Sequence, residues 1–198
     1  EIGCGWGGFA EYIAKNYNVN LDCITISQKQ YDFAKERIFK CGLNEKVNIE
    51  IKDYRDLKNK YDSIVSIEMI EAVGQNYLQS YFNILKKNLS SSGNVGIQAI
   101  TIDDSLFDRY KNKQDFIQKY IFPGGFLPSK KSLYKYADVN GLKFNEYNSY
   151  AKHYSDTLVI WREEFIKKWH LIKKQGFDVN FKKMWEFYLS YCEAGFKS

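Results

Sequence analysis

The sequence has little of what a metal site or a disulfide framework needs. It contains two histidines and four cysteines, and the cysteines show neither a CxxC pair nor the spacing of a zinc site. We therefore expect no metal, and scattered cysteines fit a reducing, cytoplasmic compartment better than disulfide pairing. No apolar run approaches the roughly 18 residues of a membrane-spanning helix. No run of five or more basic residues marks a nucleic-acid-binding segment, so nucleic acid is not an expected partner.

Aromatic residues, in contrast, are abundant. The chain has 16 Tyr, 14 Phe and 4 Trp among its 198 residues, in an otherwise ordinary globular composition. Part of this aromatic content belongs in a core, and part suits a site for an apolar ligand or a cation. The net charge of +5 is spread along the chain, which fits an anionic membrane face or a phosphorylated substrate.

The alternation of strand and helix patterns in the first half predicts an α/β fold. Short β-rich runs predict strands over residues 19–26, 46–54, 61–69 and 95–102. Apolar stripes at helical spacing predict helices over residues 9–17, 28–41 and 76–89, with a turn at 90–94. Strands that alternate with helices in this way form a doubly wound, mostly parallel sheet.

The second half has a different character. Residues 115–129 hold both prolines and two glycines between apolar residues, which predicts a structured, lid-like loop. We expect a late strand over 142–150, a helix over 157–174, and a further helix with an aromatic stripe over 181–192. The chain shows no linker or internal repeat, so we expect a single domain over residues 1–198.

The opening stretch "EIGCGWGGFAEYIAK" is typical of a ligand-binding turn. Glu1 and Ile2 end a strand, four glycines follow within six residues, and a helix begins after them. Glycines at such a junction let the backbone approach a bound molecule closely. A dinucleotide and S-adenosylmethionine are the two ligands that this turn commonly holds.

The neighbouring strands favour S-adenosylmethionine. Dinucleotide enzymes usually end their second strand with an acidic residue for the ribose, whereas here that strand ends "CITIS". After the third strand, "KDYRDL" puts Asp53 where methyltransferases carry a residue near the adenine.

Several longer motifs carry a family resemblance. In chain order they are "IGCGWGG", "DYRDL", "SIEMIEAVG", "IQAITI", "KYIFPGGFLPS", "HYSDTL" and "YCEAGF". The chain resembles the cyclopropane-fatty-acyl-phospholipid synthases and the related mycolic acid cyclopropane synthases over essentially all 198 residues. The resemblance implies a class I S-adenosylmethionine-dependent methyltransferase fold with added helices. It also implies that the chain is an internal fragment that lacks its N-terminal region and its C-terminal end.

The resemblance further implies a reaction. A methylene group passes from S-adenosylmethionine to a cis double bond of an unsaturated phospholipid acyl chain, and a cyclopropane ring forms. An alkene is a weak nucleophile, so positioning must supply much of the acceleration, and a developing cation must be shielded from water. A bound bicarbonate is the implied proton acceptor.

Motif matching places the implied catalytic residues. Glu71, Ile100 and Tyr154 match three bicarbonate-binding positions, and Gln98 stands where many members carry a histidine. Glutamine can donate a hydrogen bond to an oxyanion, but it cannot carry the proton. Cys192 matches a cysteine that has been assigned to catalysis in the family, although the methyl transfer needs no thiol. The alternatives are a helix-capping role for Glu71, packing for Tyr154 and a buried inert thiol for Cys192.

Glu68 is a neighbouring acidic candidate that we rank below Glu71. The resemblance also implies a cofactor-binding set. It comprises Gly3, Cys4, Gly5, Trp6, Gly7, Thr25, Ser27, Gln30, Asp53 and Tyr54. Ser27 could equally be a helix cap.

Two other functions remain open. A cation that does not close to a ring gives a methyl-branched or methyl-alkene fatty acid, made by a fatty-acid C-methyltransferase. A relative without catalysis would instead be a lipid-binding or scaffold protein. The expected partner is a phospholipid acyl chain at a membrane surface, with the protein peripheral at the inner face of the membrane, and a homodimer is left open.

Overall fold

The computed structural model describes residues 1–198, which divide into two compact units. The first unit contains residues 1–118 and 122–144, and the second contains residues 119–121 and 145–198. The expectation of a single methyltransferase domain stays a prediction.

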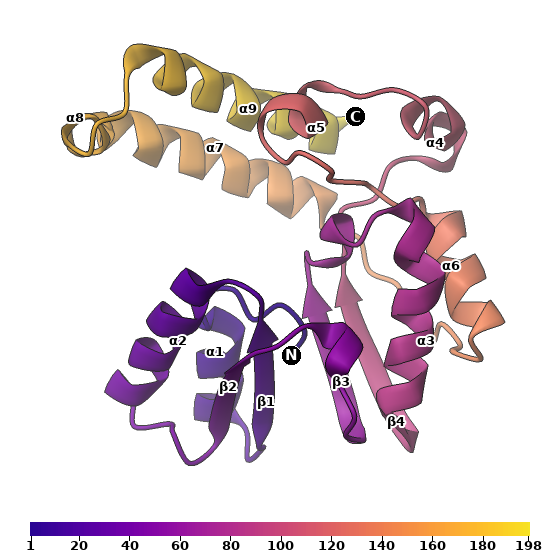
Figure 1. Ribbon diagram of the computed structural model, residues 1–198. Coiled ribbons are helices and arrows are strands. Elements are labelled where there is room, and N and C mark those ends of the chain that lie inside the picture. Colours follow the sequence, from indigo (N-terminus) through magenta and orange to yellow (C-terminus); the bar gives the residue numbers. More distant parts are fainter. The chain divides into compact units, whose positions relative to one another are not determined.

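The first unit is built on parallel strand pairs with helices packed against them (Figure 1). β1 (Leu21–Thr25) pairs with β2 (Val47–Ile51), and β3 (Tyr61–Ile67) pairs with β4 (Leu89–Gln98). Each strand contains residues predicted to be extended, because β-branched and apolar side chains suit a half-buried pleated surface. The predicted α/β fold with parallel strands is confirmed.

The segment Glu1–Gly3 joins the two pairs. The Ile2 N–H donates to the Val65 carbonyl at 2.8 Å, and the Ile24 N–H donates to the Glu1 carbonyl at 3.0 Å. The Gly3 N–H in turn donates to the Ile24 carbonyl at 3.0 Å. The order across the sheet is therefore β2, β1, residues 1–3, β3 and β4, and the glycine turn leaves from the centre of the sheet.

The helices of the first unit cover two apolar clusters. One cluster lies between β1, β2 and the helices α1 (Gly8–Asn16) and α2 (Gln28–Lys40), around the buried Ala10, Ala14 and Ala34. The other lies between β3, β4, α3 (Leu78–Asn88) and α6 (Lys130–Val139). Tyr81 and Phe82 of α3 are fully buried. Burial of a phenylalanine-sized side chain stabilises the folded state by about 1.5–3 kcal/mol.

The remaining elements of the first half are short. The 3-10 turns η1 (Tyr54–Asp56), η2 (Ile70–Ala72) and η3 (Gln75–Tyr77) follow β2 and β3. Helices α4 (Asp104–Tyr110) and α5 (Phe116–Tyr120) lie between β4 and α6. The region 115–129 is structured as predicted, since Phe126 and Pro128 are buried, and a lid function for it stays a prediction.

Three local predictions are wrong. The predicted turn at 90–94 lies inside β4, where the pairing register jumps from Tyr61–Leu89 to Ser63–Asn94. These additional residues bulge from the ladder instead of ending it. Residues 142–150 form no strand, because their alternating pattern finds no hydrogen-bonding neighbour. The helix expected over 157–174 breaks at Lys168 into α7 (Ala151–Lys167) and α8 (Trp169–Lys174).

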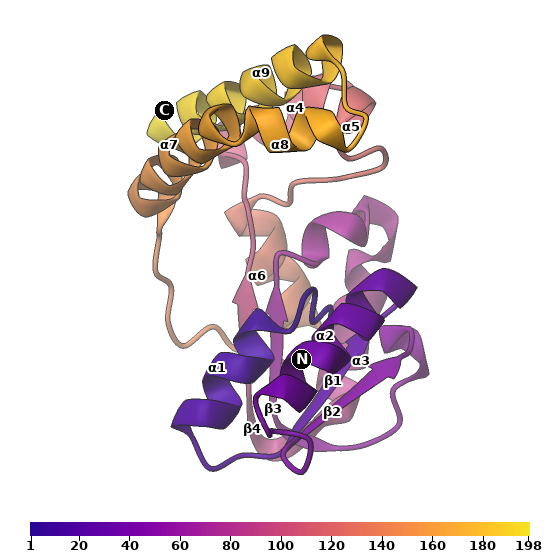
Figure 2. The same ribbon diagram turned by 90° about the vertical axis from the view of Figure 1, so that its left-hand side faces the viewer.

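The second unit is a helical hairpin of α7 and α9 (Val179–Lys197), joined through α8 (Figures 1 and 2). Tyr154 near the start of α7 stacks on Phe196 near the end of α9, with ring centroids 4.4 Å apart. Arg162 pairs with Glu193 at 3.0 Å. The first contact joins the start of α7 to the end of α9, and Phe165 late in α7 meets Phe181 early in α9, so the two helices run antiparallel.

Candidate active site

The glycine turn is shaped by close packing on one side and open space on the other. Gly3 has a φ of +79°, and a β-carbon there would lie 2.8 Å from the Met69 Cγ. Gly5 also has a positive φ, +53°, but a β-carbon there would meet nothing within 4 Å. A side chain at position 3 is therefore excluded by the backbone conformation and by Met69. At position 5 the backbone conformation also favours glycine, but the space beside it is open. A ligand can approach the backbone at Gly5.

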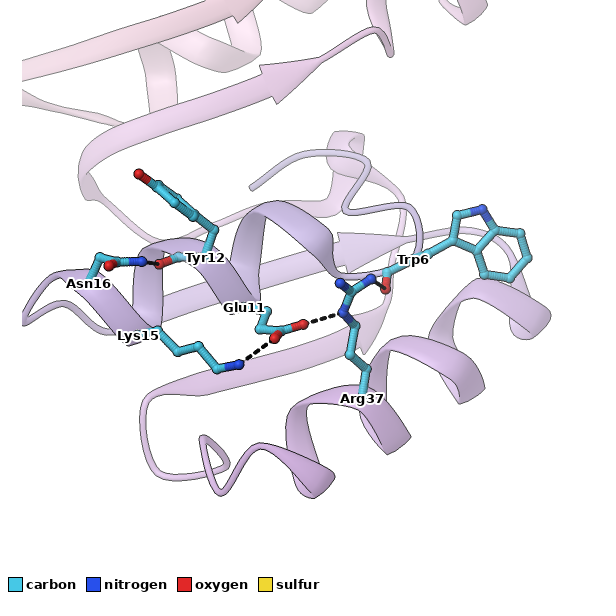
Figure 3. Close-up of polar contacts among 6 residues, drawn as sticks. All are labelled: Trp6, Glu11, Tyr12, Lys15, Asn16 and Arg37. Atoms are coloured by element: carbon cyan, nitrogen blue, oxygen red, sulfur yellow. Dashed lines mark hydrogen bonds and ion pairs between the residues drawn. The ribbon is translucent and has the colours of Figure 1, made fainter. Parts of the chain in front are cut away.

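An ion-pair network holds the turn against α2 (Figure 3). Glu11 of α1 accepts hydrogen bonds from Lys15 and from the Arg37 guanidinium. Arg37 also donates to the Trp6 carbonyl at 3.4 Å. These cationic donors lower the pKa of Glu11 to about 2, with the Lys15 hydrogen bond as the largest cause. Neither Glu11 nor Arg37 was predicted, because the pairing of residues so far apart in the sequence leaves no local pattern.

Two side chains of the turn have different environments. Cys4 is buried, and burial raises the pKa of its thiol to about 11, so it is a packing residue with little thiolate. Trp6 is 53% exposed and meets Phe33 edge-to-face at 5.4 Å. The two rings provide an aromatic surface beside the turn.

The end of β1 brings Thr25, Ser27 and Gln30 together. The Thr25 hydroxyl donates to the Gln30 side-chain oxygen at 2.8 Å and accepts from the Ser27 N–H at 3.2 Å. Ser27 caps α2 through its side chain, as its alternative role predicts. The Ile24 carbonyl accepts from both Gly3 and Cys4, so this cluster adjoins the glycine turn.

Asp53 and Tyr54 follow β2, the strand beside β1. Asp53 accepts from the Arg55 backbone N–H at 2.9 Å and from its guanidinium at 2.6 Å, and this side-chain hydrogen bond lowers the pKa of Asp53. Tyr54 packs edge-to-face on Tyr81 with centroids 5.5 Å apart, and burial raises its pKa. The structure thus places the predicted cofactor-binding residues at the carboxyl ends of adjacent strands, where α/β sheets bind ligands.

A buried carboxylate lies after β3. The Glu71 Oε1 accepts from the Ile100 N–H at 2.6 Å, while its Oε2 is buried without a hydrogen-bond partner. Burial is the main cause that raises the pKa of Glu71. Two of the predicted catalytic residues are therefore in direct contact. A buried carboxylate oxygen without a partner is costly and marks a functional candidate.

Gln98 and Glu68 form a second contact next to this one. The Gln98 Nε2 donates to the Glu68 Oε1 at 2.8 Å, and the Glu68 N–H donates to the Gln98 carbonyl at 2.9 Å. Glu68 has a φ of +49°, which no other non-glycine residue shares in sign. No local pattern predicts this backbone conformation, which is more usual at glycine or asparagine.

The other two predicted catalytic residues belong to the second unit. Tyr154 on α7 lies between the rings of Phe196 and Trp161, as the packing alternative expects. Cys192 on α9 is partly buried. A catalytic role for either residue stays a prediction.

A family model described as Mycolic acid cyclopropane synthetase matches residues 1–198. The chain belongs to this family. The cyclopropane synthetase resemblance drawn from the motifs is thereby confirmed over the whole chain.

Curated relatives include enzymes with different named products. The chain is 40% identical to the tuberculostearic acid methyltransferase UfaA1 of Mycobacterium tuberculosis, over all of this chain and 46% of that protein. It is 36% identical to the cyclopropane-fatty-acyl-phospholipid synthase of Escherichia coli K12, over all of this chain and 49% of that protein. The chain thus spans about half the length of these relatives.

Solved structures show the same fold. A crystal structure of mycolic acid cyclopropane synthase CmaA1, complexed with SAH and CTAB, matches with a TM-score of 0.87 at 24% identity. The match covers 98% of this chain and 71% of that one. The fold is that of S-adenosylmethionine-dependent methyltransferases. No helix in this chain is long and apolar enough to cross a membrane.

Proposed function

We propose that this family member transfers a methylene group from S-adenosylmethionine to a cis double bond of an unsaturated phospholipid acyl chain, forming a cyclopropane fatty acid. One arrangement carries the proposal. The glycine turn, open at Gly5, lies beside the loop that carries the buried Glu71 carboxylate, because Gly3 packs on Met69 two residues before Glu71. A methyl donor and a polar group for the proton can therefore meet at one edge of the sheet.

The residues around the glycine turn fit S-adenosylmethionine. The open backbone at Gly5 suits the methionine and ribose part, together with Thr25 and Gln30 at the end of β1. Asp53 and Tyr54 after β2 are proposed to border the adenine. When bound, S-adenosylmethionine supplies an electrophilic methyl group on a sulfonium. The named presence of SAH in the CmaA1 structure supports this assignment.

The surroundings of Glu71 fit a bicarbonate ion. The partnerless Oε2 is an acceptor for the ion's O–H, and the amide of Gln98 retains a second N–H for an oxyanion. When bound, bicarbonate supplies a proton acceptor for ring closure. Ile100 is a further ligand implied by resemblance, and Glu71 would hold the ion's orientation.

A methyl transfer without ring closure is the second candidate. The observation in its favour is the 40% identity to a protein named as a tuberculostearic acid methyltransferase. Gln98, which cannot carry a proton, is compatible with this outcome. Loss of a proton from the cation would give a methyl-alkene acyl chain on the same lipid, and a saturated methyl-branched chain would need a hydride from a separate reductant.

Isotope labelling separates the two products. The native gene is expressed in bacteria rich in unsaturated lipids, without a cyclopropane synthase of their own, and fed methionine with a trideuterated methyl group. Ring closure removes a proton from the added carbon, so two of the three deuterium atoms remain in the acyl chain. A methyl-alkene formed by loss of a proton from the acyl chain keeps all three. An exocyclic methylene also keeps two, and the vinyl carbon resonances of the isolated fatty acid distinguish it from the ring.

Two negative results have separate meanings. Bound S-adenosylmethionine without added carbon in the lipids would contradict the acyl substrate. Failure to bind S-adenosylmethionine at all would favour a lipid-binding or scaffold protein without catalysis.

We also propose that the α8 end of the hairpin contacts an anionic membrane surface. Residues 167–183 contain six lysines against one aspartate, a net charge of +5 that equals the charge of the whole chain. Glu164 pairs with Lys167 and Lys168, and Glu186 pairs with Lys182, so Lys173, Lys174 and Lys183 have no carboxylate partner.

Exposed apolar side chains lie among these cations, at Leu171, Phe177 and Val179. Cations interleaved with exposed apolar groups bind anionic lipid headgroups at the interface.

Vesicle sedimentation tests this surface. We expect binding to phosphatidylglycerol vesicles that weakens with salt, and little binding to phosphatidylcholine vesicles. The double change Lys173→Glu with Lys174→Glu should abolish it. Lys86→Glu with Lys87→Glu is the matched control, because these lysines also occupy the last turn of a helix. Equal loss in both variants would contradict a specific role for the α8 end.

A further inference from the structure

Glu68 has a backbone conformation that its residue type does not favour. Its φ of +49° lies in the left-handed region, where the β-carbon of an L-residue crowds the following carbonyl oxygen. Glycine would adopt this conformation without that penalty. A strained residue that persists beside a candidate site points to a role for its side chain.

The side chain of Glu68 is held to Gln98. The Gln98 Nε2 donates to the Glu68 Oε1 at 2.8 Å, and the backbone N–H of Glu68 donates to the Gln98 carbonyl at 2.9 Å. Glu68 directly follows β3, and Gln98 is the last residue of β4. The two strand ends are thus joined by one backbone and one side-chain hydrogen bond.

The carboxylate determines the orientation of the Gln98 amide. A carboxylate has no hydrogen to donate, so the NH2 end of the amide, and not its oxygen, faces Glu68. An amide is planar, so engaging one of its two hydrogens also fixes the direction of the other. That second hydrogen is the one that Gln98 retains for a ligand.

The oriented amide belongs to the same segment that contacts the buried carboxylate. The Ile100 N–H, two residues beyond Gln98, donates to the Glu71 Oε1 at 2.6 Å. Glu68 and Glu71, three residues apart on one loop, therefore hold residues 98 and 100 of the same neighbouring segment. Residue 98, which Glu68 holds, is thus two positions from the residue that contacts Glu71, whose Oε2 has no partner.

We propose that Glu68 is a positioning residue that fixes the Gln98 amide in one orientation beside Glu71, and that its strained backbone is retained for this purpose. This inference rests on the proposed function. The proposed role of Glu68 affects the step after methyl transfer, in which the cation on the acyl chain either closes to a ring or gives a methyl product. It does not affect the binding of S-adenosylmethionine.

Two substitutions at Glu68 separate positioning from folding. Glu68→Gly relieves the backbone strain and removes the carboxylate. We expect a thermal midpoint that is equal or higher, unchanged S-adenosylmethionine affinity, a turnover lowered by about tenfold, and a changed ratio of ring to methyl product. Glu68→Gln retains an acceptor oxygen for Gln98 and should restore most of the turnover. A variant that only damaged the fold would lower the midpoint and the affinity as well.

A double-mutant cycle tests the dependence on Gln98. In a Gln98→Ala background, Glu68→Gly should have no further effect on turnover or product ratio. Independent, multiplicative effects of the two substitutions would overturn the proposal. So would a Glu68→Gly variant with the turnover and product ratio of the wild type.

A spectroscopic measurement keeps this test separate from that of the reaction. In protein labelled with 15N-glutamine, the two side-chain N–H resonances of Gln98 should lie further apart than those of a free glutamine amide, and in Glu68→Gly they should return to the free separation. Unchanged resonances would overturn the positioning role even if the enzyme is fully active. Wild-type protein that transfers no methyl group to lipid would contradict the proposed function and leave the resonance test in force.

Discussion

The Ile100 N–H and the Glu71 Oε1 are 2.6 Å apart, which ties the loop after β3 to the segment after β4. The other carboxylate oxygen is buried and receives no hydrogen bond. One oxygen of Glu71 therefore ties the two segments together, while the second is left without a partner.

Glu71→Gln should lower methyl transfer to lipid by about 100-fold, because the site loses its carboxylate while its shape is kept. Stability at neutral pH should not fall, since an amide avoids the cost of burying a charge. Transfer of a labelled methyl group and thermal unfolding measure the two effects. Glu36→Gln is the control, because Glu36 is an exposed glutamate paired with Lys40. A Glu71→Gln variant with full activity would contradict the catalytic assignment.

The stability contribution of Glu71 should depend on pH in a defined direction. Burial raises its pKa in the folded state, so the folded protein holds this proton more tightly than the unfolded chain does. Stability from this group is present at pH values below its unfolded pKa and is lost as pH rises through the folded pKa. The midpoint of Glu71→Gln minus that of the wild type should therefore increase between about pH 4 and neutral pH. A difference that decreases over this range would show that another group dominates.

Glu11 should show the opposite dependence. Lys15 and Arg37 lower its pKa to about 2, so its stabilising contribution is present above the unfolded pKa and is lost as pH falls towards 2. Glu11→Gln should destabilise the protein at neutral pH and have little effect near pH 2. We also expect S-adenosylmethionine to bind several-fold more weakly, because Arg37 would no longer be held at the Trp6 carbonyl. Thermal unfolding across pH and calorimetric titration at neutral pH measure these effects.

Alanine at Gly3 and at Gly5 should produce different defects. Gly3→Ala forces a β-carbon to within 2.8 Å of Met69 at a positive φ, which should cost about 1–3 kcal/mol of the free energy of unfolding. Gly5→Ala meets open space and should cost about 1 kcal/mol through its backbone alone. Its affinity for S-adenosylhomocysteine should instead fall by about tenfold, because the methyl group occupies the ligand's approach. Urea unfolding and calorimetry on both variants decide between these roles, and equal effects on affinity would contradict an open site at Gly5.

Local patterns predicted the features that depend on local physics. The apolar face of α3, with Leu78, Phe82 and Leu85, is visible in the sequence because helical spacing alone places these side chains together. The glycine turn was recognisable because the positive φ values at Gly3, Gly5 and Gly7 favour glycine. Family resemblance assigned Glu71 and Ile100 to one site, whereas their direct contact was not predicted, since no local pattern joins residues 29 positions apart.

Features that depend on tertiary partners were missed. Residues 142–150 alternate like a strand but lack a neighbour with which to pair, and residues 90–94 resemble a turn yet are carried within β4. The left-handed Glu68 is stabilised by Gln98, whose position depends on the β3–β4 register. The backbone conformation at these positions depends on pairing within the assembled sheet. This pairing outweighs the local preference of each residue for a turn or a strand.

The hydrogen bonds of Ile2 and Ile24 give the sheet a central seam made from the residues that lead directly into the glycine turn. A molecule that immobilises the turn must also slow the opening of this seam. Amide hydrogen exchange at Ile2 and Ile24 should therefore report occupancy of the turn, although neither side chain is expected to touch the ligand. The free energy needed to separate the β1–β2 pair from the β3–β4 pair would therefore increase as more methyl donor is bound.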